Sequence, residues 1–330
     1  SVVVPFNFNG TVPITVTNPA GAGARSASLP NAFTYNQPPA APPPPGGSSL
    51  YGTLLDNTGS GHVEVHALSQ ASHYSQFSVH AATAFGSPTG ATADWQFFIA
   101  GFHGDGQPDL FGVHVRNTAS RRVEVHVLSA ASGYQTFVLH AATAFGEIPP
   151  NQFQFALGSF AGDRSSDLYA IILNNTGSNT VEVHVLSEAS NYSSWLLHSA
   201  SALGTTSPAA WQFRIGDRYG SGDLVGILHT ATGSGRTEVH ILSRVGGYQN
   251  FALHVATPLG ATTDSQFAYT LGDHDSDGIP DLYDVLMNGS GSGQTEIDVI
   301  SGASKYTAFI EQAASGLGPT SVPSWEYSAH

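Results

Sequence analysis

A strand-like segment recurs five times along the chain and constrains the fold more than any other feature. Its copies begin at residues 50, 110, 168, 224 and 282 and read LYGTLLDN, LFGVHVRN, LYAIILNN, LVGILHTA and LYDVLMNG. Each copy is followed by a turn rich in small residues and by two further segments in which polar and apolar residues alternate. Alternation with a period of two, together with β-branched and aromatic residues, predicts antiparallel strands. Repetition of such a unit indicates a propeller or a solenoid.

A fourth strand-like segment precedes the second to fifth copies and decides how the repeats close. It reads DWQFFIAG, NQFQFALG, AWQFRIGD and SQFAYTLG, and it recurs at the C-terminus as SWEYSAH, residues 324–330. The C-terminal segment can therefore complete the unit that opens at Leu50. We expect an all-β fold, a five-bladed propeller of four-stranded blades over residues 50–330. Closure of this kind removes the free sheet edges that an open stack would expose.

The propeller is preceded by a Pro-rich segment and a short head. Residues 37–49 favour an extended spacer, which separates residues 1–36 from the repeats. The head predicts about three strands, and GTVPITVTNPAGA with LPNAFTY resembles the closing strands of an immunoglobulin-like domain of the IPT/TIG type. Three strands cannot enclose a sandwich core. We expect either a domain cut within its length, or an apolar face covered by the propeller or by another copy of the chain adding strands.

Charge and composition exclude several classes of partner. Lys and Arg total 10 against 24 acidic residues, which gives a net charge of −14, and the chain has no cysteine. Nucleic acid and anionic membrane surfaces are therefore unsuited as partners, and thiolate metal sites are excluded. The chain also lacks an apolar run long enough for membrane insertion. The abundance of small polar residues suits a secreted or cell-surface protein, whose signal sequence would lie upstream of Ser1.

The segment from residue 273 to 281 carries the pattern D-x-D-x-D-G-x-x-D. Ca²⁺ prefers six to eight oxygen ligands, and alternate positions of a tight loop can direct carboxylates at one centre. Gly278 permits the sharp turn. The pattern predicts a structural calcium site formed by four carboxylates and one backbone carbonyl, from Asp273, Asp275, Asp277, Ile279 and Asp281.

The equivalent loops of the other units retain fewer acidic residues. GFHGDGQPD keeps Asp105 and Asp109 and predicts a weak second calcium site, whereas the remaining loops are expected to be plain turns. Fewer carboxylates mean weaker calcium binding.

Strands joined by D-x-D-x-D-G-x-x-D loops in a propeller resemble the FG-GAP/VCBS repeats. Such repeats occur in integrin α-subunit heads, in certain fungal lectins and as appendages of secreted bacterial hydrolases. DLYAI, TGSGRTEVHILS and ASGYQTFVLHAATA are most similar to the last group. The resemblance covers residues 50–330 and implies structural calcium at the loop from Asp273 to Asp281.

Histidines recur in four of the five units. Each unit has a Glu, a His two residues later on the same strand face, and a second His fourteen residues further on: Glu64, His66 and His80; Glu124, His126 and His140; Glu182, His184 and His198; Glu238, His240 and His254. With a turn between them, the two histidines could face each other across a hairpin. One interpretation is Zn²⁺ binding or proton sensing. We favour a hydrogen-bonded ladder between blades, since a repeated feature usually belongs to the scaffold. The fifth unit has Asp298 and Gln312 instead.

Aromatic residues also recur at fixed places: Tyr74, Tyr134, Tyr192, Tyr248 and Tyr306 in one turn, and Trp95, Trp211 and Trp325 at the start of the first strand. Aromatic rings near loops can stack on sugars, but at a repeated position we expect packing between blades.

No nucleophile elbow, His-Glu-x-x-His motif or phosphate loop occurs, so we expect no enzymatic activity. The expected function is an extracellular binding or adhesion module that recognises glycans through pockets between blades or on one face. The alternatives are a structural subunit of an extracellular fibre or surface layer, joined through the head strands, and an accessory domain of a secreted hydrolase.

Overall fold

The computed structural model describes residues 10–17, 26–35, 47–88, 91–149, 152–160, 162–216, 222–262 and 266–330. The chain divides into two compact units, Ser1–Pro43 and Pro44–His330, and their boundary falls within the predicted spacer. In the first unit, β1 (Gly10–Thr17) and β2 (Ser26–Tyr35) form an antiparallel hairpin. A third head strand, and the spacer up to residue 46, lie outside the described residues.

The second unit consists of five four-stranded antiparallel sheets. We number them blades 1 to 5. Blade 1 contains β22 (Trp325–Ala329), β3 (Leu50–Leu54), β4 (His62–Leu68) and β5 (Phe77–Gly86). Blade 2 contains β6 (Trp95–Ala100), β7 (Asp109–His114), β8 (Arg122–Leu128) and β9 (Phe137–Gly146). Blade 3 contains β10 (Phe153–Gly158), β11 (Asp167–Ile172), β12 (Thr180–Leu186) and β13 (Trp195–Gly204). Blade 4 contains β14 (Trp211–Gly216), β15 (Asp223–Leu228), β16 (Arg236–Leu242) and β17 (Phe251–Gly260). Blade 5 contains β18 (Phe267–Gly272), β19 (Asp281–Leu286), β20 (Glu296–Ile300) and β21 (Phe309–Ala314).

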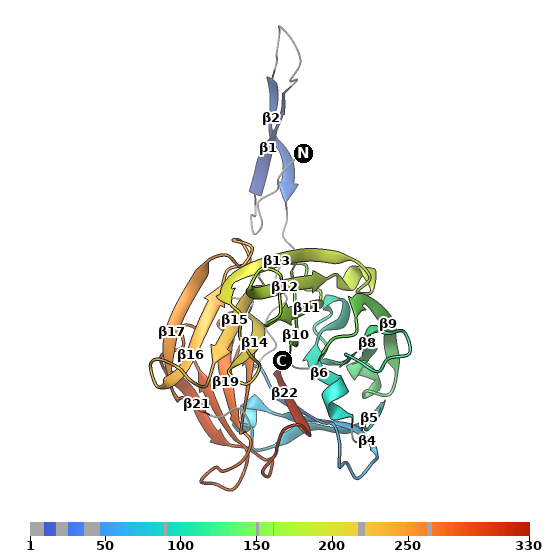
Figure 1. Ribbon diagram of the computed structural model, residues 1–330, viewed down its shortest axis with the longest axis vertical. Coiled ribbons are helices and arrows are strands. Elements are labelled where there is room, and N and C mark those ends of the chain that lie inside the picture. Colours follow the sequence, from blue (N-terminus) through green and yellow to red (C-terminus); the bar gives the residue numbers. More distant parts are fainter. Residues whose placement is uncertain are drawn as a thin grey trace. The chain divides into compact units, whose positions relative to one another are not determined.

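The five-bladed propeller with four-stranded blades is therefore confirmed. Short 3₁₀ helices lie in the loops, at Gln70–Ser72, Thr92–Asp94, Phe102–Gly104, Ala130–Ser132 and Glu188–Ser190. The first strand of every blade faces the centre, where β6, β10, β14, β18 and β22 contact one another around the ring (Figure 1).

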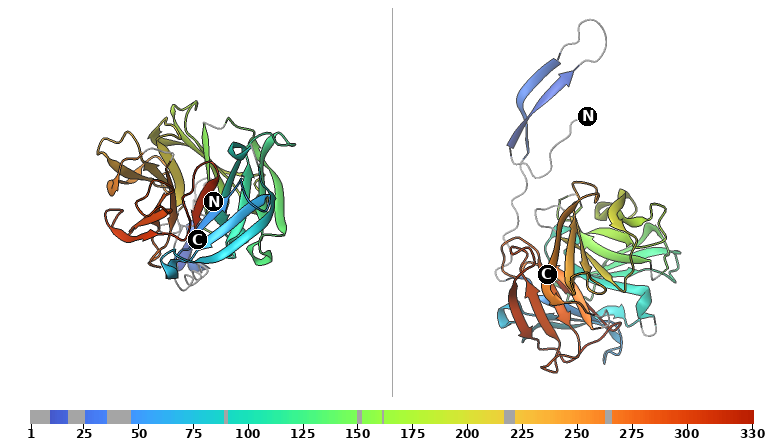
Figure 2. Two further views of the ribbon diagram at one scale, coloured as in Figure 1. Left: turned by 90° about the horizontal axis from the view of Figure 1, so that it is seen from below. Right: turned by 60° about the vertical axis from the view of Figure 1, so that its left-hand side comes forward.

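The ring closes through the C-terminal strand, as the sequence predicts. β22 pairs antiparallel with β3, from Trp325 opposite Leu54 to Ala329 opposite Leu50. In the ribbon views this strand, drawn in dark red, lies inside the ring of blades (Figure 2). The first blade is thus built from both ends of the propeller sequence, and no sheet is left incomplete.

The hydrophobic core is divided among the five seams between blades. Each of five buried clusters joins residues of two neighbouring blades; one of them packs Val125 and Val127 of blade 2 against Phe155 and Leu168 of blade 3. Period-two alternation produces this arrangement, because every second residue of a strand faces the neighbouring sheet. Burial of a Val or Leu side chain contributes about 1.5 to 3 kcal/mol, so the seams hold the ring together.

The recurrent tyrosines pack in these seams. All five are at most 3% exposed. Their backbone carbonyls accept hydrogen bonds from the outer strand of the preceding blade in three seams, and from Gly316, just after β21, in a fourth. For example, the Ala144 amide donates to the carbonyl of Tyr192 over 3.0 Å. The prediction of packing between blades is confirmed for the tyrosines, whose rings are too buried to stack on a sugar.

Candidate functional site

The aspartate loop between β18 and β19 brings together three of the four predicted carboxylates. Oxygens of Asp273, Asp275 and Asp281 lie within 4.8 Å of one another, whereas Asp277 lies outside this group. An ion that binds oxygens at about 2.3 to 2.6 Å can span this separation. Burial, with added repulsion from neighbouring carboxylates, raises the pKa of Asp281 to about 6. The donor set and its concentrated negative charge fit a hard cation.

Backbone amides organise the same loop. Asp273 accepts hydrogen bonds from the amides of Asp277 and Gly278, both at 3.0 Å, and Asp277 accepts one from the amide of Ile279 at 2.7 Å. Gly278 has a positive φ of 80°, as the turn requires. Asp275 accepts a further bond from the amide of Asp277 at 3.3 Å, so each of the three alternating aspartates binds a backbone amide of the loop. Their carboxylates keep further lone pairs for a cation.

Asp281 has a second role that the sequence did not indicate. It is fully buried, and its two oxygens accept hydrogen bonds from the amides of His274 and Gly302, both at 2.8 Å. The matching aspartates of other blades bind the equivalent amides: Asp109 those of Phe102 and Ala130, Asp167 those of Phe160 and Glu188, and Asp223 that of Arg244. This position therefore braces two loops of its blade whether or not a cation binds.

The predicted weak second site gathers fewer ligands. Asp105 accepts a hydrogen bond from the Gln107 amide at 2.8 Å, and no third carboxylate or imidazole converges on Asp105 and Asp109 among the described residues. The loop is instead held by Glu188 of blade 3, which contacts the amide and the imidazole of His103, each at 2.9 Å.

The paired histidines do face each other across a hairpin. His66 lies opposite His80, and the same register holds for His126 with His140, His184 with His198, and His240 with His254. Phe85 of blade 1 contacts His126 of blade 2, which places the pairs at the seams. Burial lowers the pKa of the inner histidine in all four blades, which favours the neutral imidazole.

The four pairs adopt two arrangements. In blades 2 and 3 the two Nδ1 atoms of each pair lie 2.7 Å apart and share a hydrogen bond. In blades 1 and 4 the rings are turned so that both Nε2 atoms approach one oxygen of the neighbouring glutamate. These hydrogen bonds join two strands of the same blade. The prediction that they would link neighbouring blades is therefore wrong. In blade 5, the Gln312 amide donates to Asp298 over 3.1 Å.

The outermost strands carry exposed apolar residues that sequence reasoning missed. We call the first two residues of β5, β9, β13, β17 and β21 the rim positions. Seven of these side chains are between 36% and 47% exposed: Phe77, Val138, Trp195, Leu196, Phe251, Phe309 and Ile310. Trp195 and Phe137 lie with ring centroids 4.3 Å from His198 and His140. An apolar feature repeated at the same surface position differs from the scattered exposed residues of an ordinary surface.

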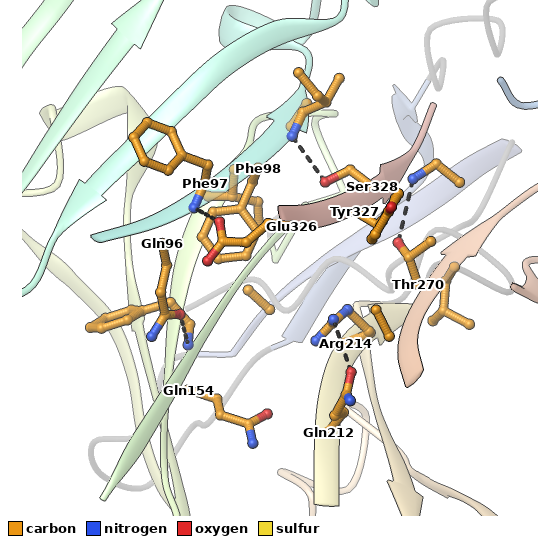
Figure 3. Close-up of a pocket in the computed structure, with 18 of the residues that line it drawn as sticks. Gln96, Phe97, Phe98, Gln154, Gln212, Arg214, Thr270, Glu326, Tyr327 and Ser328 are labelled. Atoms are coloured by element: carbon orange, nitrogen blue, oxygen red, sulfur yellow. Dashed lines mark hydrogen bonds between the residues drawn. The ribbon is translucent and has the colours of Figure 1, made fainter. Parts of the chain in front are cut away.

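A cavity of about 390 Å³ occupies the centre of the ring (Figure 3). The second residue of each inner strand projects toward it, and in three successive blades that residue is a glutamine. The Oε1 atoms of Gln96, Gln154 and Gln212 accept hydrogen bonds from the next blade, from the amides of Phe155 at 3.2 Å, Phe213 at 2.8 Å and Tyr269 at 3.1 Å. Glu326 occupies the same place in blade 1 and accepts from the Phe97 amide.

Two charged residues face this cavity. Arg214 donates to the carbonyl of Phe213 at 2.8 Å and to Gln212 at 3.4 Å, and no carboxylate of the described residues lies within 4 Å of its guanidinium. Burial lowers the pKa of Arg214 to about 10 and raises that of Glu326 to about 8. Glu326 is therefore mostly protonated at pH 7 and replaces a glutamine as a neutral hydrogen-bonding group.

No helix in the described part of the chain is long and apolar enough to cross a membrane. No known protein family matches the sequence, and no curated protein matches it either.

Proposed function

We propose that this protein is a non-enzymatic extracellular binding module that recognises glycans at the seams of its propeller, with calcium stabilising the loop from Asp273 to Asp281. The observation that carries the proposal is the set of rim positions, where aromatic side chains are exposed beside the paired histidines.

The chemistry of the rim suits sugars. The faces of Phe77, Trp195 and Phe251 can stack on the apolar face of a pyranose, because an aromatic ring offers a large flat apolar surface. The imidazole groups beside them can exchange hydrogen bonds with the hydroxyl groups of a sugar. Repetition around the ring favours multivalent ligands, since binding at a second seam becomes intramolecular after the first.

Calcium would act in this protein as a structural ion. Asp273, Asp275 and Asp281 would supply carboxylate oxygens, and Asp277 and the Ile279 carbonyl are the further ligands expected from the sequence pattern. The ion would offset the mutual repulsion of the carboxylates and fix the connection between β18 and β19.

A glycan array probed with the full chain in millimolar calcium tests the proposal. We expect binding to a defined group of glycans, weakened by Trp195→Ala and by Phe251→Ala. Val245→Ala is the matched control, because Val245 is 84% exposed but lies outside the rim positions. An array without any binder, or binding that Val245→Ala weakens as much as Trp195→Ala does, would contradict the proposal.

A second candidate function rests on the head. β1 and β2 form an isolated two-stranded sheet among the described residues, and such a hairpin is only marginally stable alone. Its free edges could pair with strands of another copy, as in a fibre or surface layer. Mass measurement in solution tests this candidate: concentration-dependent oligomers lost on deletion of residues 1–36 support it, and a monomer at all concentrations refutes it.

A further inference from the structure

We infer that blades 1 and 4 each bind one Zn²⁺ ion, in blade 1 through Glu64, His66 and His80, and in blade 4 through Glu238, His240 and His254. This inference concerns metal chemistry and does not depend on glycan binding. It rests on the positions of three ligand atoms in each blade.

The three atoms in each blade are spaced as zinc ligands would be. Oε2 of Glu64 lies 3.4 Å from Nε2 of His66 and 3.9 Å from Nε2 of His80. In blade 4, Oε2 of Glu238 lies 3.3 Å and 3.6 Å from the Nε2 atoms of the two histidines. Zinc binds nitrogen and oxygen at about 2.0 to 2.2 Å in a tetrahedron, which separates neighbouring ligand atoms by roughly 3.4 Å.

Hydrogen bonding does not account for this convergence. Nε2 of His66 and Nε2 of His240 are buried, and their contacts with the glutamate oxygens, at 3.4 Å and 3.3 Å, are longer than a well-formed hydrogen bond. A buried imidazole nitrogen without a partner carries a desolvation cost. A metal ion between the three atoms would remove that cost by accepting the nitrogen lone pairs.

The glutamates are held in place for such a role. The other carboxylate oxygen, Oε1, accepts a hydrogen bond from Ser60 in blade 1 and from Ser234 in blade 4, both at 2.6 Å. Hydrogen bonds of this kind orient metal-ligating carboxylates. The inner histidines stand on central strands, β4 and β16, which fixes their backbone.

Each site is open on one side. The side chains of His80 and His254 are 64% and 62% exposed, so an ion can enter from solvent and keep a water molecule as its fourth ligand. Two imidazoles and one carboxylate favour zinc over calcium, which prefers oxygen ligands. The histidine sites and the aspartate loop would therefore select different ions.

The other blades provide internal comparisons. In blades 2 and 3 the histidine pairs hydrogen-bond through their Nδ1 atoms, and only the inner histidine has its Nε2 within 4 Å of the glutamate. Blade 5 has Asp298 and Gln312 at the paired positions. Blade 2 also brings ligand atoms of His114, Glu124 and His126 within 4.8 Å of one another, but none of these side chains is exposed and the His114 ring stacks on Trp95. We therefore expect two zinc ions for each chain, in the two blades whose outer histidine completes the group.

Calorimetric titration of Zn²⁺ into the metal-stripped, untagged full chain, with calcium in excess, tests the inference. We expect two equivalents for each chain. His80→Gln and His254→Gln should each remove one equivalent, and the double variant should remove both. His140→Gln in blade 2 is the matched control and should leave both. The substituted side chains are largely exposed, so an unchanged melting temperature of the calcium-loaded protein shows that the fold is retained.

Cobalt provides a second measurement. Co²⁺ in place of Zn²⁺ should give the intense visible absorption of a four-coordinate ion, and the double variant should lose it. Absence of zinc uptake by the parent chain, or equal uptake by the double variant, would overturn the inference.

Discussion

Replacing Glu326 by glutamine should stabilise the propeller, and by an amount that grows with pH. Glu326 accepts a hydrogen bond from the Phe97 amide, as Gln96, Gln154 and Gln212 accept one from the next blade. Glu326→Gln preserves that bond and removes a group that can ionise. Burial raises the pKa of Glu326 from 4.5 to about 8. The folded protein therefore keeps a proton that the unfolded chain has already released between these two values.

Proton linkage determines whether stability rises or falls with pH. Stability falls as pH rises wherever the folded state binds more protons than the unfolded state. The parent protein should lose stability from about pH 4.5 to about pH 8. One pKa unit corresponds to about 1.4 kcal/mol, so the whole change in the Glu326 pKa could lower the free energy of unfolding by at most about 5 kcal/mol. The Glu326 residue is only partly buried and lines the cavity, so solvent screening reduces this effect and we expect about 2 to 3 kcal/mol.

Guanidinium denaturation of the two proteins from pH 4 to pH 9 measures this difference. They should agree within about 0.5 kcal/mol at pH 4, and the glutamine variant should be more stable above pH 8. Gln154→Glu, at the equivalent position of blade 3, should introduce a similar pH dependence. A difference between parent and Glu326→Gln that is constant across pH, or that favours the parent at high pH, would refute the reasoning.

Three further predictions concern calcium, packing and closure. A chelator should lower the melting temperature by roughly 5 °C, because a ligand at 100 times its Kd adds about 2.7 kcal/mol to the free energy of unfolding. Scanning calorimetry should show that Asp275→Ala abolishes this sensitivity and that Asp105→Ala does not. Gly226→Ala should destabilise the protein by about 1 to 3 kcal/mol in a denaturant titration, because the new Cβ would lie 2.9 Å from ring atoms of the neighbouring inner strand. Gly233→Ala is the control and should be neutral, because its Cβ would meet nothing within 4 Å. Deletion of residues 324–330 removes β22 and should abolish cooperative unfolding followed by near-ultraviolet circular dichroism; a cooperative transition in the truncated chain would show that closure is dispensable.

The fold could be predicted because its strands are marked by short sequence patterns that repeat along the chain. Alternation identifies strands, and the isolated copy SWEYSAH identifies the strand that closes the ring. The opposition of His66 and His80 could also be predicted, because a hairpin of fixed register brings residues fourteen apart together. The orientation of the imidazole rings could not be predicted, because the same combination of one glutamate and two histidines adopts two arrangements in different blades.

Features that depend on the arrangement of strands within and between blades were not accessible from the sequence. Asp281 reads as the last residue of a calcium pattern, but its second partner, the Gly302 amide, lies 21 residues away across the blade. Arg214 and Glu326 read as isolated charges in alternating strands, and only the arrangement of five inner strands places both at one cavity. The rim residue Trp195 reads as a core residue, because nothing local shows that its strand is outermost.

The number of glycan sites on each chain tests the central claim most directly. Calorimetric titration with a monovalent glycan selected from the array should give more than one equivalent for each chain, and Trp195→Ala should reduce that number by one because the seams bind independently. A single equivalent that Trp195→Ala leaves intact and Arg214→Gln abolishes would place recognition in the central cavity and contradict the account.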